Sequence, residues 1–554
     1  MKNNWVSRIC RIHSDTNMSK SHKLNDASIK VSKASAFVYL IQYIQRGRSG
    51  KYSDNAEIKF HLFDSANYAI WNNYNMRYMN FLRFVCLLMI YVMFNAFALA
   101  NHVIVHDSIP KVNVENKKIN LVLNPGFEVS AVNPENWIIT GPISTMKPVT
   151  DIDDYIRYSG KYGLRMSSSN PKCNGRTAQI VRVTGGQTYL FSAMFKSKNV
   201  RSVNKCVLIR ITWFNGKENI GYHYLNNKTE GSNDWFLISQ KIKALPQATS
   251  LEISLEFRWS IGSVWWDDIS IEEATPDSSR NVKIGTVYCR PPGGTVQNNI
   301  NTMSDLLDQA GISNCQIVCL PEGWVTYGTG LGMSKVESNI LTGSASSMLS
   351  QKSKQYNMYI VSGLYSWEGD TLYNTGVLFD RQGNRKAVYK KVHLPYSEIE
   401  QGAVPGDSYA VVDTDFGKIG ILVCWDYAFP EPSRILALKG AEIIFCPIWG
   451  DLRGTDIWKL TARARAVDNS VYFVTSIYDG HSLIINPAGE VLKESGSTNA
   501  LLTETIDLNY SPFWNWIGNP GRGEWSGIWR KDRRPDTYDD LSDFESTDIQ
   551  QPSK

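Results

Sequence analysis

The stretch Lys418-Ile-Gly-Ile-Leu-Val-Cys424-Trp-Asp426 joins a continuous apolar run to a cysteine and an aspartate. A short run that is apolar throughout, without alternation, is typical of a strand buried on both faces of a parallel sheet. Similar runs recur in this half of the chain, and helical patterns separate them. The further runs lie at 282–288, 316–320, 358–364, 443–448 and 471–477, and the helical patterns at 295–310, 431–439 and 456–468. Residues 282–510 are therefore predicted to form an α/β domain.

Two further segments of this region carry reactive side chains. Cys319-Leu-Pro-Glu322 places a carboxylate just after an apolar run, and Tyr389-Lys-Lys391-Val-His393 holds a lysine pair. Because sites assemble at strand ends in α/β sheets, Glu322, Lys391 and Cys424 are candidates for one site. Each also has an ordinary structural interpretation, since single cysteines are often small buried hydrophobic residues, and glutamates and lysines usually lie at the surface.

Together and in this order, the three segments resemble the carbon–nitrogen hydrolase (nitrilase) superfamily over about 282–510. The resemblance implies a four-layer αββα sandwich, a homodimer or higher oligomer, no cofactor, and no metal in the catalytic site. It also implies a catalytic triad of Glu322, Lys391 and Cys424. The backbone N–H of Trp425 would complete an oxyanion site beside the triad.

These residue types suit the cleavage of a carbon–nitrogen bond. A free thiol is only a few per cent thiolate at neutral pH, so Cys424 needs a base, and Glu322 is suited to take its proton. Attack on an amide carbon develops negative charge that Lys391 stabilises. We therefore expect a hydrolase that cleaves a small non-peptide amide or N-carbamoyl compound through a cysteine thioester. A nitrilase proper is an alternative, ranked lower because amide-type activities are commoner across the superfamily.

Many family members carry a second glutamate after the lysine motif, which orients the lysine and the substrate. Two candidates follow here, Glu398 and Glu400. The family usually carries this residue in an Ile-Glu pair shortly before a Pro-Gly, which here is Pro405-Gly406. The resemblance therefore favours Glu400 as a fourth catalytic residue, with Glu398 as the open alternative.

The region 120–274 has a different pattern. Over residues 251–259 apolar and polar side chains alternate, which predicts a half-buried strand, and short strands punctuated by Gly, Asn and Ser predict an all-β sandwich. Its two ends, 120–128 and 264–271, resemble the jelly-roll carbohydrate-binding modules of secreted glycan enzymes. That resemblance implies a polysaccharide ligand and a structural calcium at Glu128 and Asp268. A sandwich that only packs against its neighbour is the alternative interpretation.

The second resemblance leaves a different function open. The chain could be a glycan-binding surface protein that uses the hydrolase fold as a dimerising scaffold. An intact set of Glu322, Lys391 and Cys424 argues against this alternative, because a degenerate relative is expected to have lost one member.

The charge of the chain is concentrated in its first part. The 554 residues carry a net charge of +5, but residues 1–83 hold 13 Lys and Arg against 5 Asp and Glu, and the remainder holds 45 against 48. The globular part therefore shows no electrostatic footprint for nucleic acid. With 43% apolar and 20% charged residues, the chain has the composition of a globular protein rather than a disordered one.

The apolar stretch 84–100 follows two arginines and ends in Ala98-Leu-Ala100, a small-x-small cleavage pattern. Read from Met79, residues 79–100 form a secretory signal peptide, or an uncleaved membrane anchor through 84–100. Either interpretation predicts a secreted or extracytoplasmic protein. Residues 1–78 are then a leader that does not belong to the natural protein. At the other end, residues 511–554 show no clear period and are expected to be a C-terminal tail that wraps a partner subunit or is partly disordered.

Overall fold

The computed structural model describes residues 119–333, 343–450, 456–496, 499–515 and 522–542, all within one compact unit of the chain. The leader at 1–78 and the signal peptide or anchor at 79–100 lie outside these described residues. Within the described ranges, no helix combines the length and the apolar character that a bilayer crossing requires.

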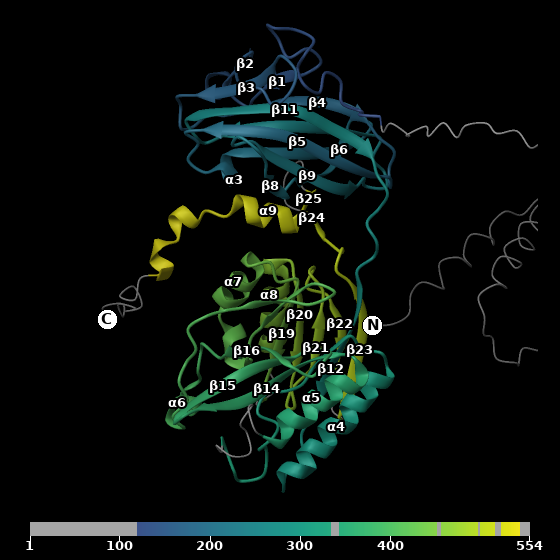
Figure 1. Ribbon diagram of the computed structural model, residues 1–554, viewed down its shortest axis with the longest axis vertical. Coiled ribbons are helices and arrows are strands. Elements are labelled where there is room, and N and C mark those ends of the chain that lie inside the picture. Colours follow the sequence, from purple (N-terminus) through teal and green to yellow (C-terminus); the bar gives the residue numbers. More distant parts are fainter. Residues whose placement is uncertain (1–118, 334–342, 451–455, 497–498, 516–521, 543–554) are drawn as a thin grey trace, which may run out of the picture. The chain divides into compact units, whose positions relative to one another are not determined.

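Residues 119–274 form two antiparallel β-sheets around a core of apolar side chains (Figure 1). The first sheet has the strand order β1-β4-β10-β6-β7 and continues into two strands from the C-terminal segment, and the second has the order β2-β3-β11-β5-β9-β8. The elements are β1 Ile138–Thr140, η1 Ser144–Met146, β2 Val149–Asp153, β3 Gly163–Ser168, β4 Asn174–Arg182, β5 Thr188–Lys198, α3 Val203–Cys206, β6 Val207–Asn215, β7 Glu218–Tyr224, β8 Lys228–Glu230, β9 Phe236–Lys243, β10 Ser250–Arg258 and β11 Gly262–Glu273.

Strand β10 contains the alternating sequence and has one face in this core. Its other face is not open to water, because Ser254 and Glu256 are buried as well. Arg210 Nε lies 2.6 Å from Glu256 Oε1, and Arg258 is 3.5 Å from Asp532 in the C-terminal segment. Charged side chains and the C-terminal segment therefore cover the outer face that the alternation predicts to be solvated.

Residues 281–507 form the α/β domain, which contains two six-stranded sheets. The first sheet has the order β16-β15-β14-β13-β12-β23 and the second β17-β18-β19-β20-β21-β22. The central strands of each sheet are parallel, and antiparallel strands flank them. The elements are β12 Asn281–Tyr288, α4 Val296–Ile312, β13 Ile317–Cys319, α5 Ser344–Tyr356, β14 Tyr359–Glu368, β15 Thr371–Phe379, β16 Arg385–Lys390, α6 Tyr396–Glu400, β17 Val411–Asp413, β18 Lys418–Ile421, η2 Cys424–Ala428, α7 Pro430–Leu438, β19 Ile443–Pro447, α8 Ile457–Asn469, β20 Tyr472–Ser476, β21 Leu483–Ile485, β22 Val491–Glu494 and β23 Ala500–Asp507.

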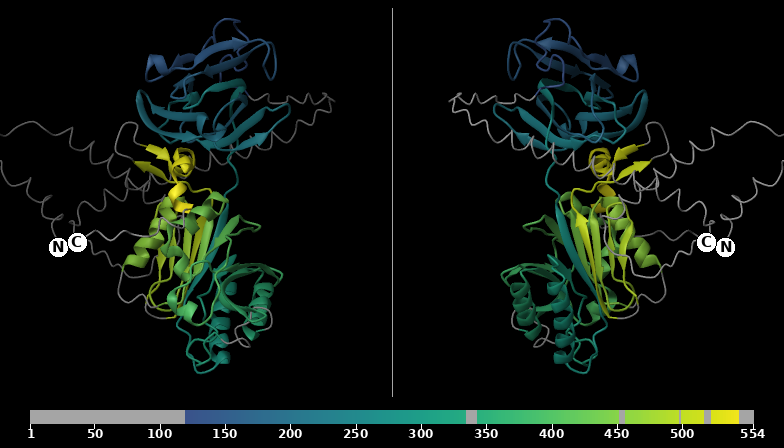
Figure 2. Two further views of the ribbon diagram at one scale, coloured as in Figure 1. Left: turned by 90° about the vertical axis from the view of Figure 1, so that its left-hand side faces the viewer. Right: turned by 90° about the vertical axis from the view of Figure 1, so that its right-hand side faces the viewer.

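The two sheets of the α/β domain pack face to face with helices on both outer sides (Figure 2). The largest core cluster lies between the sheets and extends to α7 and α8. A second cluster joins the first sheet to α4 and α5. The domain is therefore layered as helix, sheet, sheet and helix, and the parallel strands of both sheets are buried on each face, as their continuous apolar sequences require.

The C-terminal segment, for which the sequence shows no clear period, contains regular elements in its described part. It contains β24 Phe513–Asn515, β25 Arg522–Glu524, α9 Trp525–Asp532, η3 Pro535–Thr537 and η4 Asp539–Ser542. Gly523 of β25 pairs with Tyr222 of β7, so the segment extends a sheet of the N-terminal sandwich. Trp525 Nε1 also donates a 2.8 Å hydrogen bond to the carbonyl of Val467 in α8. These long-range partners give order to a segment whose local pattern shows none.

Candidate active site

Cys424 lies at a sharp turn just after β18, the first parallel strand of the second sheet. Strand β18 ends at Ile421, and η2 begins at Cys424 itself. The residue has a φ of +45°, a left-handed conformation that side chains with a Cβ rarely adopt. Cys424 is half-buried, whereas the other cysteines in the described ranges are buried. The strained turn thus presents this thiol at the end of the strand, where a site is expected.

Asp426 fixes that turn to the segment that carries the lysine. Its carboxylate is fully buried, and Oδ2 accepts hydrogen bonds from the N–H of Val423 at 3.0 Å and the hydroxyl of Tyr389 at 2.7 Å. Oδ1 accepts from the N–H of His393 at 2.9 Å. A single carboxylate therefore links the two segments.

Lys391 stands at the centre of a buried cluster of polar side chains. Its Nζ donates to Glu322 Oε1 at 3.0 Å and to Glu398 Oε1 at 2.6 Å. Asn374 Nδ2 links the same two carboxylates, at 2.5 Å from Glu322 Oε1 and 3.1 Å from Glu398 Oε2. Lys391 and Glu322 are each 1% exposed. Buried charges of this kind are tolerated only when paired and hydrogen-bonded, and here each one is.

The two oxygens of Glu322 have different surroundings. Oε1 accepts both hydrogen bonds described above, whereas Oε2 is buried without a hydrogen-bond partner among the described residues. A buried carboxylate oxygen without a partner carries a desolvation cost of about 1–3 kcal/mol or more. Such an atom is available to accept a proton from a thiol or a water that enters the site.

Burial and neighbouring charges set the protonation states of the site. Burial raises the pKa of the Cys424 thiol, and the nearby Glu322 raises it further, against the opposing effect of Lys391. Burial would lower the pKa of Lys391, but Glu322, Cys424 and Glu398 outweigh it and hold that pKa well above its ordinary value. Burial and Glu322 also raise the pKa of Glu398. The resting site therefore holds a neutral thiol beside a charged lysine.

The structure corrects the choice between the two glutamates that follow the lysine motif. Glu398 lies in the cluster and is 8% exposed, whereas Glu400 is exposed and has no described contact with Lys391. Both belong to α6, and residues two apart on a helix do not share a face. The preference for Glu400, which rested on its place in an Ile-Glu pair, was wrong about which carboxylate reaches the lysine.

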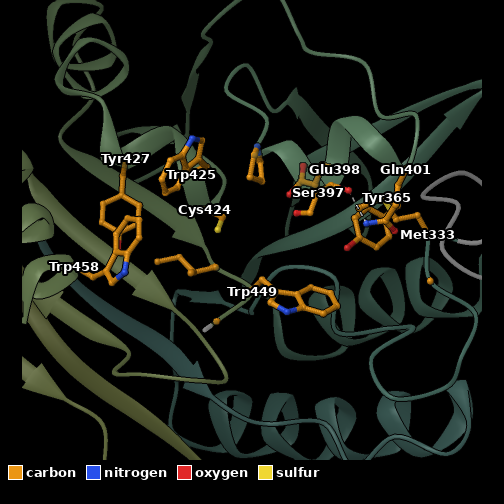
Figure 3. Close-up of a pocket in the computed structure, with 14 residues that line it drawn as sticks. Met333, Tyr365, Ser397, Glu398, Gln401, Cys424, Trp425, Tyr427, Trp449 and Trp458 are labelled. Carbon is orange, nitrogen blue, oxygen red and sulfur yellow. Dashed lines mark hydrogen bonds between the residues drawn. The ribbon is translucent and has the colours of Figure 1, made fainter. Parts of the chain in front are cut away.

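A cavity of about 540 Å³ opens beside the thiol (Figure 3). Cys424 and Glu398 both line it, which places the nucleophile and one carboxylate of the cluster on a common space. A volume of this size is within the range of small-molecule sites. The side chain of Trp425 lines the cavity too. The backbone N–H of Trp425 lies in the first turn of η2, where N–H groups have no partner inside the helix. Its role as an oxyanion donor stays a prediction.

A sequence model of the carbon–nitrogen hydrolase family matches residues 283–515. An omega-amidase from Xenopus laevis is 33% identical over 233 residues, which cover 38% of this chain and 84% of that protein. The chain belongs to the carbon–nitrogen hydrolase family. It is accordingly a hydrolase of carbon–nitrogen bonds other than peptide bonds.

Further proteins are similar to part of the chain. The human omega-amidase is 30% identical over 231 residues, 38% of this chain and 83% of that protein. A probable nitrilase from Schizosaccharomyces pombe is 29% identical over 272 residues, 46% of this chain and 96% of that protein. Among solved structures, an amidase from Nesterenkonia sp. AN1 is 25% identical with a TM-score of 0.37, over 40% of this chain and 92% of that one.

Three residues of this carbon–nitrogen hydrolase's site were not assigned by sequence reasoning. Asn374 bridges the two glutamates, Asp426 joins the two active segments, and the backbone of Trp449 contacts the Cys424 thiol. Asp426 stood in the quoted nucleophile segment without a role. Asn374 is a polar residue within the strand β15, and such an interruption is the signal that could have identified it.

The residues at the expected calcium site do not fit a calcium ion. The structure brings Glu128 and Asp268 to the same segment, but Glu128 Oε1 accepts from the backbone N–H groups of Lys161 and Tyr162, and Asp268 Oδ1 accepts from the hydroxyl of Ser159. Calcium needs six to eight oxygen ligands, and N–H donors occupy this position instead. No group of three or more metal-binding side chains is found in the described part of the chain.

Proposed function

We propose that the chain hydrolyses a small non-peptide amide or N-carbamoyl compound through a thioester on Cys424. The observation that carries the proposal is the buried cluster beside the thiol, in which Glu322 keeps one oxygen without a partner. The names of the curated relatives, omega-amidases, support an amide over a nitrile. A nitrilase proper remains the runner-up.

In the acylation half-reaction, Glu322 Oε2 takes the thiol proton as Cys424 Sγ attacks the carbonyl carbon. The carbonyl oxygen gains negative charge, which the Lys391 ammonium and the N–H of Trp425 stabilise. Removing one such donor typically costs about 3–4 kcal/mol of transition-state energy. The proton then passes from Glu322 to the nitrogen, the carbon–nitrogen bond breaks, and ammonia or an amine leaves a thioester behind.

In the deacylation half-reaction, a water molecule takes the place of the amine. Glu322 accepts its proton while the water oxygen attacks the thioester carbon, and Lys391 again faces the developing oxyanion. The carbon–sulfur bond breaks, the carboxylic acid leaves, and Glu322 returns the proton to the thiolate of Cys424. Acylation needs a base because the raised pKa of the thiol keeps it protonated at rest, and deacylation needs one because the attacking water must lose a proton.

Replacement of the nucleophile tests this mechanism. Cys424→Ala and Cys424→Ser are expected to abolish ammonia release from a panel of primary amides and carbamoyl compounds while the chain stays folded by thermal unfolding. Cys173→Ala provides a matched control, because that free thiol is buried in the sandwich. Retained turnover in a Cys424 variant would refute the mechanism. Turnover of nitriles but of no amide or carbamoyl compound by the unmodified chain would instead identify a nitrilase.

We also propose that the N-terminal sandwich binds a polysaccharide. Trp235 and Trp265 pack together on one face of the sandwich, and Tyr158 contacts Trp235 edge-on at 5.6 Å. The neighbouring Tyr155 is 87% exposed. Exposed aromatic side chains next to an apolar cluster are typical of binding surfaces. Polysaccharide binding by the sandwich is compatible with hydrolysis at Cys424. It would be the main function of the protein only under the alternative in which the hydrolase fold serves as a dimerising scaffold.

Binding is best tested on the full chain with Cys424→Ala, since β24 and β25 belong to a sheet of the sandwich and an isolated module would lack them. Sedimentation with insoluble plant, algal and bacterial polysaccharides should show retention. Tyr155→Ala with Tyr158→Ala should abolish it, and Tyr396→Ala, an exposed tyrosine on α6, should not. If no polysaccharide of the panel retains the chain, the sandwich serves only to pack against its neighbour.

Export and a homodimer complete the proposed function. The support for export is the apolar stretch 84–100 with its small-x-small end, and the support for a dimer or higher oligomer is the family resemblance. N-terminal sequencing of the natural protein tests the first, and a chain that begins near Asn101 is expected. Light scattering of the full chain tests the second, and a monomer at micromolar concentration would refute it.

A further inference from the structure

The cavity beside Cys424 has two chemically different walls. On one side of the thiol lie Ser397, Glu398 and Gln401 from α6 and the turn after it, and on the other lie Trp425, Tyr427 and Trp458 (Figure 3). The first wall offers carboxylate, hydroxyl and amide groups, with Tyr365 and Met333 beside Gln401 (Figure 3). The second consists of large aromatic rings, so it favours contact with apolar surface.

The aromatic wall is built as one packed unit. The rings of Trp425 and Trp458 have centroids 5.7 Å apart, and those of Tyr427 and Trp458 are 5.2 Å apart. Tyr427 is fully buried beneath, and Arg465 of α8 donates a 3.0 Å hydrogen bond to its carbonyl oxygen. The wall therefore has a fixed shape before any ligand arrives, which lowers the entropy cost of binding against it.

The proposed reaction fixes which part of the substrate meets which wall. The carbonyl oxygen must face Lys391, and the leaving nitrogen must receive a proton from Glu322. Lys391 donates hydrogen bonds to both Glu322 and Glu398, and Glu398 lines the polar wall. Because oxygen, nitrogen and the acyl carbon radiate from one carbonyl centre, the acyl chain points away from this cluster, toward the aromatic wall.

We propose that the preferred substrates are amides whose acyl group carries an extended apolar or aromatic end that packs against Trp425, Tyr427 and Trp458. This inference rests on the proposed amidase function. It excludes as preferred substrates the half-amides of dicarboxylic acids, since a free carboxylate at the end of the acyl chain would lie against aromatic rings and lose hydration without an ion pair on this wall.

Three primary amides that share one skeleton test the inference on the full-length chain. Propionamide, 3-phenylpropionamide and succinamate differ only in a hydrogen, a phenyl ring or a carboxylate at the third carbon. We expect kcat/KM from ammonia release to be roughly tenfold or more higher for the phenyl compound than for propionamide, as burial of a ring would give. Succinamate should fall below propionamide.

The variant Trp458→Ala identifies the wall responsible. It should reduce the ratio of kcat/KM between 3-phenylpropionamide and propionamide roughly fivefold or more, and Trp458→Phe should retain most of that ratio. The ratio is read within one protein preparation, so a loss of active material does not imitate the effect. If Trp458→Ala fails to fold, the three-substrate series on the unmodified chain decides by itself.

The possible results separate the inference from the function on which it rests. Hydrolysis of propionamide or succinamate as fast as the phenyl compound would overturn the inference and leave the amidase function standing. An unchanged substrate ratio in Trp458→Ala would overturn the assigned wall. Failure to release ammonia from any of the three would overturn the inference, and failure on the carbamoyl compounds of the wider panel as well would refute the proposed function.

Discussion

Replacing Glu398 by glutamine should strongly reduce kcat, whereas replacing Glu400 by glutamine should leave kcat nearly unchanged. Glu398 Oε1 accepts a 2.6 Å hydrogen bond from the ammonium of Lys391 inside the protein, whereas Glu400 is exposed on the same short helix. Glutamine keeps the shape of the side chain and removes its charge. The pair Glu398→Gln and Glu400→Gln therefore isolates one buried charge.

The expected magnitude follows from the lost interaction. A hydrogen bond to a charged group contributes about 1.5–3 kcal/mol, and losing that amount from the transition state lowers the rate roughly 10- to 150-fold. Glu400→Gln is a surface change and should stay within about 0.5 kcal/mol, or roughly twofold in rate. Steady-state ammonia release from one primary amide gives kcat for both variants, with thermal unfolding as the control for folding.

The pH dependence of kcat/KM provides a second measurement, which would not change if Glu398 had a purely structural role. Burial and Glu322 raise the pKa of Glu398, so protonation of this carboxyl should contribute to the loss of kcat/KM on the acid side. In Glu398→Gln that group is absent, and the acid limb of the residual activity should move to lower pH. Equal losses of kcat in the two variants, or an acid limb that does not move, would refute the place we assign to Glu398.

Three further predictions concern other parts of the structure. Asp426→Asn should lower kcat, and it should lower the free energy of unfolding by about 1–3 kcal/mol, because an asparagine amide cannot accept all three buried hydrogen bonds. Asp468→Asn is the control and should change neither quantity, since the side chain of Asp468 is 47% exposed. Alkylation of Cys424 by iodoacetamide, followed by peptide mass spectrometry, should keep accelerating up to pH 9, since burial raises the pKa of the thiol, and a plateau from pH 6 upward would show a resting thiolate instead. Burial raises the pKa of Asp267 to about 6. The folded chain then binds this proton more tightly than the unfolded one, so the free energy of unfolding should fall by on the order of 2 kcal/mol as pH rises from about 4 to 6, and Asp267→Asn should flatten that slope in urea titrations.

The parallel core of the α/β domain was predictable from its sequence. The apolar run at 443–448 corresponds to β19, and the helical pattern at 431–439 corresponds to α7. A strand buried on both faces leaves a continuous apolar signature, so its existence is read without knowledge of its neighbours. The antiparallel flanking strands, such as β16 and β22, have exposed residues and mixed sequences, and tertiary pairing determines them.

The site was predictable to the extent that its residues occur in motifs. Glu322, Lys391 and Cys424 stand in quoted segments, and the structure brings Glu322 and Lys391 into direct contact. The choice between Glu398 and Glu400 required the direction of each side chain on α6, which depends on where that short helix docks. The C-terminal segment was missed for a similar reason, since β25 is ordered by pairing with β7 about 300 residues earlier in the chain.

The central claim is that the substrate's acyl group becomes attached to Cys424. The most direct measurement mixes the full-length chain with 3-phenylpropionamide, quenches with acid during turnover, and searches the peptides by mass spectrometry. We expect the peptide that contains Cys424 to carry the acyl group without ammonia, and Cys424→Ala to carry none and to release no ammonia. Ammonia release with no adduct on Cys424, or undiminished release from Cys424→Ala, would contradict the thioester mechanism.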